Sequence, residues 1–119
     1  MSVRLYVDDL RKAPEGWVHA KTVSAAIKIL ATQECSEVSL DHDISHRINM
    51  DSIARPFPCG ETFEPVAWFL REQALRNGKG PIVSLHTANP IGAKKMQEIL
   101  RDGGIEATIC LGVPVNGLE

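Results

Sequence analysis

Residues 38–43, Val-Ser-Leu-Asp-His-Asp, decide how this chain is organised. Glu37 to Leu40 are predicted to form a short strand that ends abruptly in a polar cluster. Side chains alternate in direction along an extended chain, so the two carboxylates could face one way and the imidazole the other. Such a cluster at a strand end suits a hard cation or a proton relay. A polar turn without any ligand is the alternative reading, because Asp and His are ordinary turn residues.

The length and composition indicate one globular domain over residues 1–119. The chain has 119 residues, of which 44% are hydrophobic, which is enough for one core and too apolar for a disordered protein. The formal net charge is −2, so the charge balance provides no general attraction to nucleic acid or to an anionic membrane. A small anionic ligand held at a local site remains compatible with this balance.

The cysteines and the apolar runs indicate in which cellular compartment the protein is expected. The three cysteines, Cys35, Cys59 and Cys110, are scattered and form no CxxC pair, which argues against a zinc knuckle or a disulfide framework. No apolar run is long enough to cross a bilayer, and the N-terminus lacks the layout of a signal peptide. We therefore expect a cytoplasmic protein without a membrane partner.

Short apolar runs and turn signals predict alternating strands and helices. The predicted strands are residues 3–7, 17–20, 37–40, 82–85 and 106–111. The predicted helices are residues 23 to about 33 after a Thr22 cap, a helix capped by Thr62 and ended by Asn77-Gly78, and a helix from Asn89-Pro90 to Gly103. Residues 44–61 are an irregular loop with a short helix around residues 50–54, and an irregular tail begins at about residue 112.

Strands that alternate with helices indicate an α/β fold. We predict a doubly wound, mostly parallel five-stranded sheet with helices on both faces. In open sheets of this kind, ligands bind outside the carboxyl ends of the strands. Three successive strand ends carry polar clusters, which are Asp8-Asp9, Asp41-His42-Asp43 and His86-Thr87-Ala88-Asn89. The sequence therefore predicts that these clusters meet at one edge of the sheet.

The acidic residues at this edge are candidate metal ligands. Asp8, Asp9 and Asp41 would hold a hard divalent ion such as Mg²⁺ or Mn²⁺ through their carboxylate oxygens. Asp43 would complete that set of ligands or orient His42, and an imidazole nearby would also admit softer ions. The plainer alternative is that Asp8 or Asp9 only caps a turn.

Two histidines are candidates for acid–base catalysis, because imidazole titrates near neutral pH. His42 lies between two carboxylates, which favour its protonated form, so we expect it to be the proton donor. His86 follows an apolar strand beside a helix start and is the expected base. A structural histidine with satisfied hydrogen bonds is the alternative for either residue.

Arg11 and Asn89 are candidate phosphate-binding residues. The guanidinium of Arg11 suits a bidentate contact with phosphate, although a solvated surface arginine is an almost equal alternative. Asn89 is the obvious cap of its helix, and a helix N-terminus also favours a bound anion.

Some of these residues resemble the receiver domain of response regulators, a flavodoxin-like module. In that family an acidic pair and a central aspartate bind Mg²⁺, and the central aspartate accepts a phosphoryl group. Asp8-Asp9 and Asp41 match these positions, and Thr87 would match the hydroxyl residue after the fourth strand. The lysine that receivers carry after the fifth strand is missing, since Cys-Leu-Gly-Val-Pro stands at residues 110–114. This absence argues against phosphoacceptor signalling.

A closer resemblance covers about residues 3–103. The motifs are Asp-Asp-Leu-Arg at 8–11, Ala-Pro-Glu-Gly-Trp at 13–17, Ser-Leu-Asp-His-Asp at 39–43 and His-Thr-Ala-Asn-Pro at 86–90. Together and in this order they resemble the family of cyclic-phosphate-processing receiver domains, from which residues 44–60 depart most.

The closer resemblance implies a metal-dependent phosphoesterase that processes cyclic phosphates on nucleotides or RNA termini. The expected partner is a small phosphorylated or cyclic-phosphate ligand, or an RNA end. A signalling receiver phosphorylated at Asp41 is one alternative, and a binding module without turnover is another. The sequence does not determine the oligomeric state.

Overall fold

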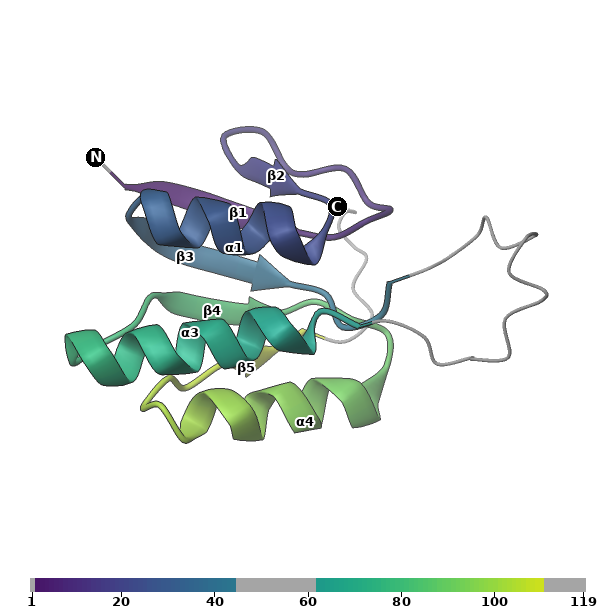
Figure 1. Cartoon of the computed structure of the whole chain (residues 1–119). Coiled ribbons are helices and arrows are strands. Elements are labelled where there is room, and N and C mark those ends of the chain that lie inside the picture. The colour runs from purple at the N-terminus through teal and green to yellow at the C-terminus, as the bar shows by residue number, and fades with distance from the viewer. Residues whose placement is uncertain (1, 45–61, 111–119) are drawn as a thin grey trace.

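The computed structural model describes residues 2–44 and 62–110, and their strands form one five-stranded sheet (Figure 1). The sheet order is β2-β1-β3-β4-β5, and every neighbouring pair of strands is parallel. The strand bounds are β1 Val3–Val7, β2 Val18–Ala20, β3 Cys35–Leu40, β4 Ile82–Leu85 and β5 Thr108–Ile109. The predicted α/β fold class is therefore confirmed.

Three strands differ in length from the prediction, and β2 differs least, because it begins at Val18 instead of residue 17. Strand β3 begins at Cys35, two residues earlier than expected, because it lies in the middle of the sheet and pairs with β1 from Val3 onwards. Strand β5 covers only Thr108–Ile109, inside the predicted range of 106–111. It is the edge strand and pairs with β4 alone, so fewer of its residues take part in a ladder.

Three helices are described: α1 Val23–Thr32, α3 Glu64–Asn77 and α4 Pro90–Arg101. Their ends follow the predicted local signals. Thr22 accepts a hydrogen bond from the backbone N–H of Ala25 at 3.0 Å, and Asn89 caps α4 in the same way, with Pro90 in its first turn. Gly78 ends α3 at a φ of 86°, where a glycine is favoured. No helix in the described part of the chain is long and apolar enough to span a membrane.

The start of α3 differs from the prediction by one residue. The N-cap position is Phe63, which provides no capping hydrogen bond, while Thr62 lies just outside and its hydroxyl accepts from the N–H of Glu64 at 3.1 Å. The phenyl ring of Phe63 is fully buried, so core packing rather than capping chemistry fixes where this helix begins. The helix predicted around residues 50–54 lies outside the described residues.

All three described helices cover one face of the sheet (Figure 1). Each connects a strand to a later one in the same direction across the sheet, from β2 past β1 to β3, from β3 to β4 and from β4 to β5. Right-handed crossovers then place the three connections on the same side. Residues 8–17 join β1 to β2 without a helix, so no crossover covers the opposite face there. Helices on both faces were expected, but those in the described residues cover one face only.

The two faces of the sheet differ in chemistry. The helix-covered face carries the core side chains of the central strands, which are Leu5, Val7, Val38, Leu40, Val83 and Leu85. The uncovered face carries the alternate side chains, among them Tyr6, Ser39 and Ser84, which are adjacent in register across β1, β3 and β4. This row crosses the strands close to the carboxyl edge of the sheet, where the predicted functional residues lie.

Candidate functional site

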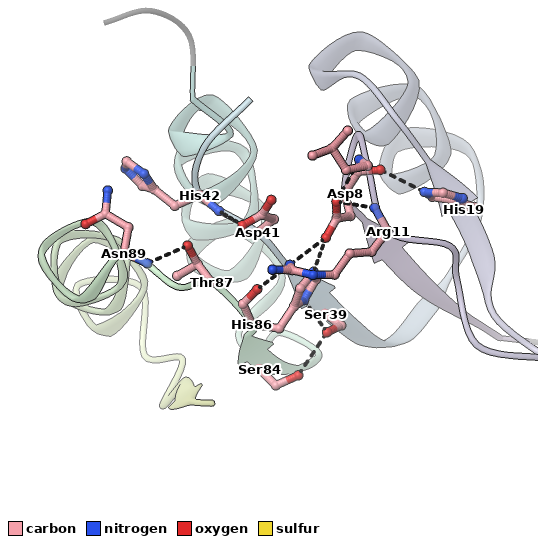
Figure 2. Close-up of polar contacts among 11 residues, drawn as sticks. Asp8, Arg11, His19, Ser39, Asp41, His42, Ser84, His86, Thr87 and Asn89 are labelled. Atoms are coloured by element: carbon pink, nitrogen blue, oxygen red, sulfur yellow. Dashed lines mark hydrogen bonds and ion pairs between the residues drawn. The ribbon is translucent and has the colours of Figure 1, made fainter. Parts of the chain in front are cut away.

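The carboxyl ends of β1, β3 and β4 are adjacent in the sheet, and each is followed by a polar side chain (Figure 2). The strand ladder continues past the assigned strand ends. The N–H of Asp41 donates to the carbonyl of Val7 at 3.0 Å, and the N–H of His86 donates to that of Leu40 at 3.0 Å. These bonds hold the three predicted clusters in register, so the topology brings them together as the sequence predicted.

Asp8 is fully buried and accepts four hydrogen bonds (Figure 2). Oδ1 accepts from the backbone N–H groups of Leu10 and Arg11 at 2.8 and 2.9 Å. Oδ2 accepts from Arg11 Nη1 at 3.1 Å and pairs with His86 Nε2 at 2.9 Å. Burial alone would raise the pKa of Asp8, but the hydrogen bonds from His86 and the two amides outweigh it and lower that pKa to about 2.

Asp41 lies beside Asp8 in a different electrostatic situation. Its side chain is buried, and Oδ1 accepts a hydrogen bond from the N–H of His42 at 2.8 Å. Burial and then the negative charge of Asp8 raise the pKa of Asp41 from 3.8 to about 6. Asp8 is thus held as an anion, while Asp41 resists ionisation as long as no positive charge offsets its neighbour.

Asp8, Asp9 and Asp41 form a group of potential metal ligands. One carboxylate oxygen from each lies within 4.8 Å of the other two. Three hard oxygen donors at such distances fit an ion such as Mg²⁺ or Mn²⁺, which prefers carboxylate ligands. A bound cation would also offset the repulsion that raises the pKa of Asp41. The residues present therefore fit the predicted divalent ion.

Asp43 lies in a second cluster, with His42, Glu64 and Asn89. His42 Nδ1 is 2.7 Å from Asp43 Oδ1, and His42 Nε2 is 2.8 Å from Glu64 Oε2. The side-chain amide of Asn89 donates to Asp43 Oδ1 at 3.2 Å. Ionised carboxylates only accept hydrogen bonds, so both ring nitrogens of His42 act as donors here. Of the two roles predicted for Asp43, the structure places it beside His42 and outside the group of three aspartates.

The first turn of α4 packs directly against the imidazole of His42. A Cβ atom added at Gly92 would lie 2.4 Å from Nδ1 of that ring, so only glycine leaves room for it. Gly92 also donates its N–H to the capping oxygen of Asn89 at 2.9 Å. His42 therefore links the end of β3 to the beginnings of α3 and α4.

Both ring nitrogens of His86 have partners within the protein. Nε2 pairs with Asp8, and Nδ1 lies 2.7 Å from the hydroxyl of Ser39. The ring stacks on Tyr6 with centroids 4.5 Å apart and an angle of 7° between the planes. Burial, followed by the charge of Asp8, raises the pKa of Tyr6. His86 therefore contacts the acidic group through Asp8 and the uncovered sheet face through its other edge.

Of the three residues predicted to bind substrate, Arg11 contacts Asp8 of the acidic group, while Thr87 and Asn89 lie at the start of α4. Arg11 is half-exposed, and its Nη1 contacts Asp8 Oδ2 and, at 3.4 Å, the carbonyl of His86. Thr87 is buried, and its hydroxyl accepts from the N–H of Asn89 at 3.1 Å. Thr87 and Asn89 thus shape the turn that starts α4, while the positively charged guanidinium of Arg11 points at Asp8.

Several residues of the site were not predicted from the sequence. Glu64 comes from the start of α3, 22 positions after His42. Ser39 and Tyr6 are strand residues without a motif of their own, and His19 Nε2 lies 2.7 Å from the carbonyl of Asp8. Their only signal is the alternation along β1 and β3, which places Tyr6 and Ser39 two residues before the aspartates Asp8 and Asp41.

A separate cavity of about 540 Å³ lies at the opposite, amino-terminal edge of the sheet. It is lined by the ends of α1 and α3 and the beginnings of β3 and β4, including Gln33, Cys35, Gln73 and Lys79. None of the predicted site residues lines it, so this cavity is not part of the candidate site at the strand ends.

The packing of His42 against α4 predicts that replacing Gly92 by alanine lowers the stability of the fold, although the same change stabilises most helices. Gly→Ala in an ordinary helix stabilises by about 0.5–1 kcal/mol. We expect Gly92→Ala to destabilise instead, by about 1–3 kcal/mol in urea denaturation, because the new methyl group displaces the imidazole. The double variant His42→Ala/Gly92→Ala should lose less stability than the two single variants added together. A Gly92→Ala variant more stable than the wild type would contradict this packing.

The shifted pKa of Asp41 predicts how stability depends on pH without metal. A carboxyl whose pKa is higher in the folded state than in the unfolded state destabilises the fold as pH rises from about 4 through about 6. Asp41→Asn removes this charge, so in EDTA at pH 7 the variant should be more stable than the wild type by roughly 1–3 kcal/mol.

This gain should disappear near pH 4, where wild-type Asp41 is protonated. Asp102→Asn, an exposed aspartate at the far end of α4, is the matched control and should show no such crossover. Equal pH dependence of the wild type and Asp41→Asn in urea titrations would refute the assigned electrostatics.

Comparison with known proteins agrees with this geometry. The model of a family described as cyclic-phosphate processing receiver domain matches residues 3–102. The match spans strands β1 to β4 and the three described helices and ends before β5, and it contains every residue discussed at the carboxyl edge. No curated protein matches the chain significantly. On the strength of the family match, the chain belongs to the family of cyclic-phosphate processing receiver domains.

Proposed function

We propose that this protein is a metal-dependent phosphoesterase that opens a cyclic phosphate on a nucleotide or an RNA terminus. The observation that carries the proposal is the pair of buried aspartates, Asp8 and Asp41, together with Asp9. Their oxygens converge at the edge of the sheet where α/β folds bind ligands, and one of the two buried carboxylates resists ionisation without a cation. The family name, which refers to cyclic-phosphate processing, supports the same substrate class.

Asp8, Asp9 and Asp41 would hold the divalent ion, with Mg²⁺ or Mn²⁺ as the expected choice. When bound, such an ion neutralises charge on a phosphate and favours attack by water. Arg11 is placed to contact the same phosphate, since its guanidinium is half-exposed while Nη1 is anchored on Asp8. The first turn of α4 presents the positive end of a helix dipole on the other side.

His86 is the proposed general base. Its side chain lies at the acidic group, 2.9 Å from Asp8, and keeps a small exposed surface. Asp8 and Ser39 occupy its two ring nitrogens in this structure, so His86 would accept a proton after one of these contacts opens. His42 is the proposed proton donor, and its two hydrogen bonds differ in accessibility. Glu64 is largely covered, whereas the Asp43 side chain is 57% exposed. Gly92 packs against Nδ1 itself, so a leaving oxygen would approach His42 by way of Asp43 rather than contact the ring. Asp43 would then orient the ring between turnovers.

Two alternatives keep the same site but change its use. A signalling receiver would accept a phosphoryl group on Asp41, as its neighbours Asp8, Asp9 and Thr87 resemble that arrangement. Residues 110–119 contain no lysine to hold the phosphoryl oxygen, which argues against this reading. A binding module would recognise a cyclic phosphate without opening it, and it would need no acid–base pair.

The proposal is tested by single-turnover hydrolysis of nucleoside 2′,3′- and 3′,5′-cyclic phosphates with Mg²⁺ or Mn²⁺. We expect the wild type to open at least one of them. His86→Ala should slow the reaction by roughly two to four orders of magnitude, the usual range for a general acid–base group, while substrate binding survives. Asp41→Asn should lose activity and the response to metal together. The control Asp102→Asn should match the wild type, because this residue is exposed and distant.

The outcomes separate the three functions. If the wild type binds a cyclic phosphate but never opens one with either ion, the binding module replaces the enzyme. An acid-labile phosphoryl group found on Asp41 by mass spectrometry after incubation with a small phosphodonor and Mg²⁺ would favour the signalling receiver instead.

A further inference from the structure

A chain of hydrogen bonds crosses the uncovered face of the sheet and ends at the acidic group (Figure 2). The hydroxyl of Ser84 on β4 donates to that of Ser39 on β3 at 3.4 Å. Ser39 Oγ lies 2.7 Å from His86 Nδ1, and His86 Nε2 lies 2.9 Å from Asp8 Oδ2. The two serines are direct partners in the register of β3 and β4, so the sheet itself sets this geometry.

The end of the chain fixes the direction of its hydrogen bonds. Asp8 already accepts from two amides and from Arg11, and as a carboxylate it can only accept from His86 Nε2. In a neutral imidazole the hydrogen therefore lies on Nε2, and Nδ1 is an acceptor. Ser39 then donates to Nδ1, and its own oxygen accepts from Ser84. Each donor in the chain finds one acceptor.

The ring of His86 is held from three sides. Ser39 contacts one ring nitrogen, Asp8 the other, and Tyr6 stacks on the face at 4.5 Å. A flip of the ring about its Cβ–Cγ bond would put carbon atoms in place of both nitrogens and break both hydrogen bonds. Partners of this kind orient metal-binding side chains and are often as important to affinity as the ligands themselves.

We propose that Ser39 is a positioning residue, which holds the ring of His86 in the orientation that donates from Nε2 to Asp8. His86 in turn fixes Oδ2 of Asp8 and leaves the carboxylate oriented toward Asp9 and Asp41. Ser39 touches neither the substrate nor the ion and acts only through His86. The effect on metal affinity depends on the metal site of the proposed function, whereas the orientation of the ring does not.

The first test is ¹⁵N spectroscopy of the imidazoles in the full, metal-free chain near neutral pH. His86 is identified by the signals that His86→Gln removes. We expect Nε2 of His86 to carry a hydrogen that is hydrogen-bonded, and Nδ1 to show a hydrogen bond to the Ser39 hydroxyl. In Ser39→Ala the Nδ1 signal should shift because this hydrogen bond is lost, while Ser39→Thr should keep the wild-type pattern because it retains the hydroxyl.

The second test is calorimetric titration with Mn²⁺. Ser39→Ala should weaken binding by about tenfold, near the lower end of the range for residues that orient metal ligands. Ser39→Thr should restore affinity to within about twofold of the wild type, as expected if the hydroxyl carries the effect. Ser36→Ala is the matched control, since it removes a hydroxyl from the exposed end of the same strand and should leave both readouts unchanged.

The two tests fail separately. A wild-type His86 without a hydrogen on Nε2 would overturn the assignment even if Mn²⁺ binds, and this measurement does not depend on the stability of any Ser39 variant. Normal Mn²⁺ affinity and an unchanged Nδ1 signal in folded Ser39→Ala would also overturn it. A wild type that binds no divalent ion would contradict the proposed function, and the spectrum of His86 would still decide the role of Ser39.

Discussion

The close approach of two buried carboxylates, Asp8 and Asp41, is the constraint on which the rest of this edge depends. Neighbouring parallel strands bring them together, because β1 and β3 are paired up to Val7 and Leu40, directly before the two aspartates. Two negative charges in a dry environment are unfavourable without compensation. Within the described residues the two charges are compensated unequally. Arg11, His86 and two backbone amides all donate to Asp8, while Asp41 receives one amide hydrogen bond there.

This asymmetry has a functional interpretation. A fold built only for stability would not leave one buried carboxyl beside another with so few donors, and such local inconsistencies are expected at functional sites. The lowered pKa of Asp8 means that this carboxylate is ionised in the folded protein. The raised pKa of Asp41 means that its ionisation would be favoured by a bound cation. Around this pair, Arg11 and the N-terminus of α4 add positive potential suited to a phosphate.

The sequence predicted the edge of the sheet better than it predicted the surroundings of each side chain. Strand ends and helix caps depend on local signals, so Asp8, Asp41, His86 and the Asn89 cap could be placed from the sequence alone. The link from His42 to Glu64 could not, because it joins the end of β3 to a helix 22 positions later. The roles of Ser39 and Gly92 depend on contacts across strands and between elements, for which a single sequence holds no pattern.

The uncovered sheet face follows from one local feature, the connection of β1 to β2 without a helix. Helices on two faces are the usual result of strand–helix alternation, and the sequence prediction followed that rule. Here residues 8–17 carry Arg11 and Trp17 instead of a helical repeat. As a result, the face of Tyr6, Ser39 and His86 is polar, and in the described residues no helix separates it from the acidic group.

Crystals of the full chain grown with Mn²⁺ test the central claim most directly, because the anomalous signal locates the ion without assumptions about activity. The account predicts one peak at about 2.0–2.4 Å from a carboxylate oxygen of Asp8, Asp9 and Asp41, the distances at which such ions bind oxygen. A saturated crystal with no peak among these three aspartates, or with the ion between Asp43 and Glu64, would contradict it.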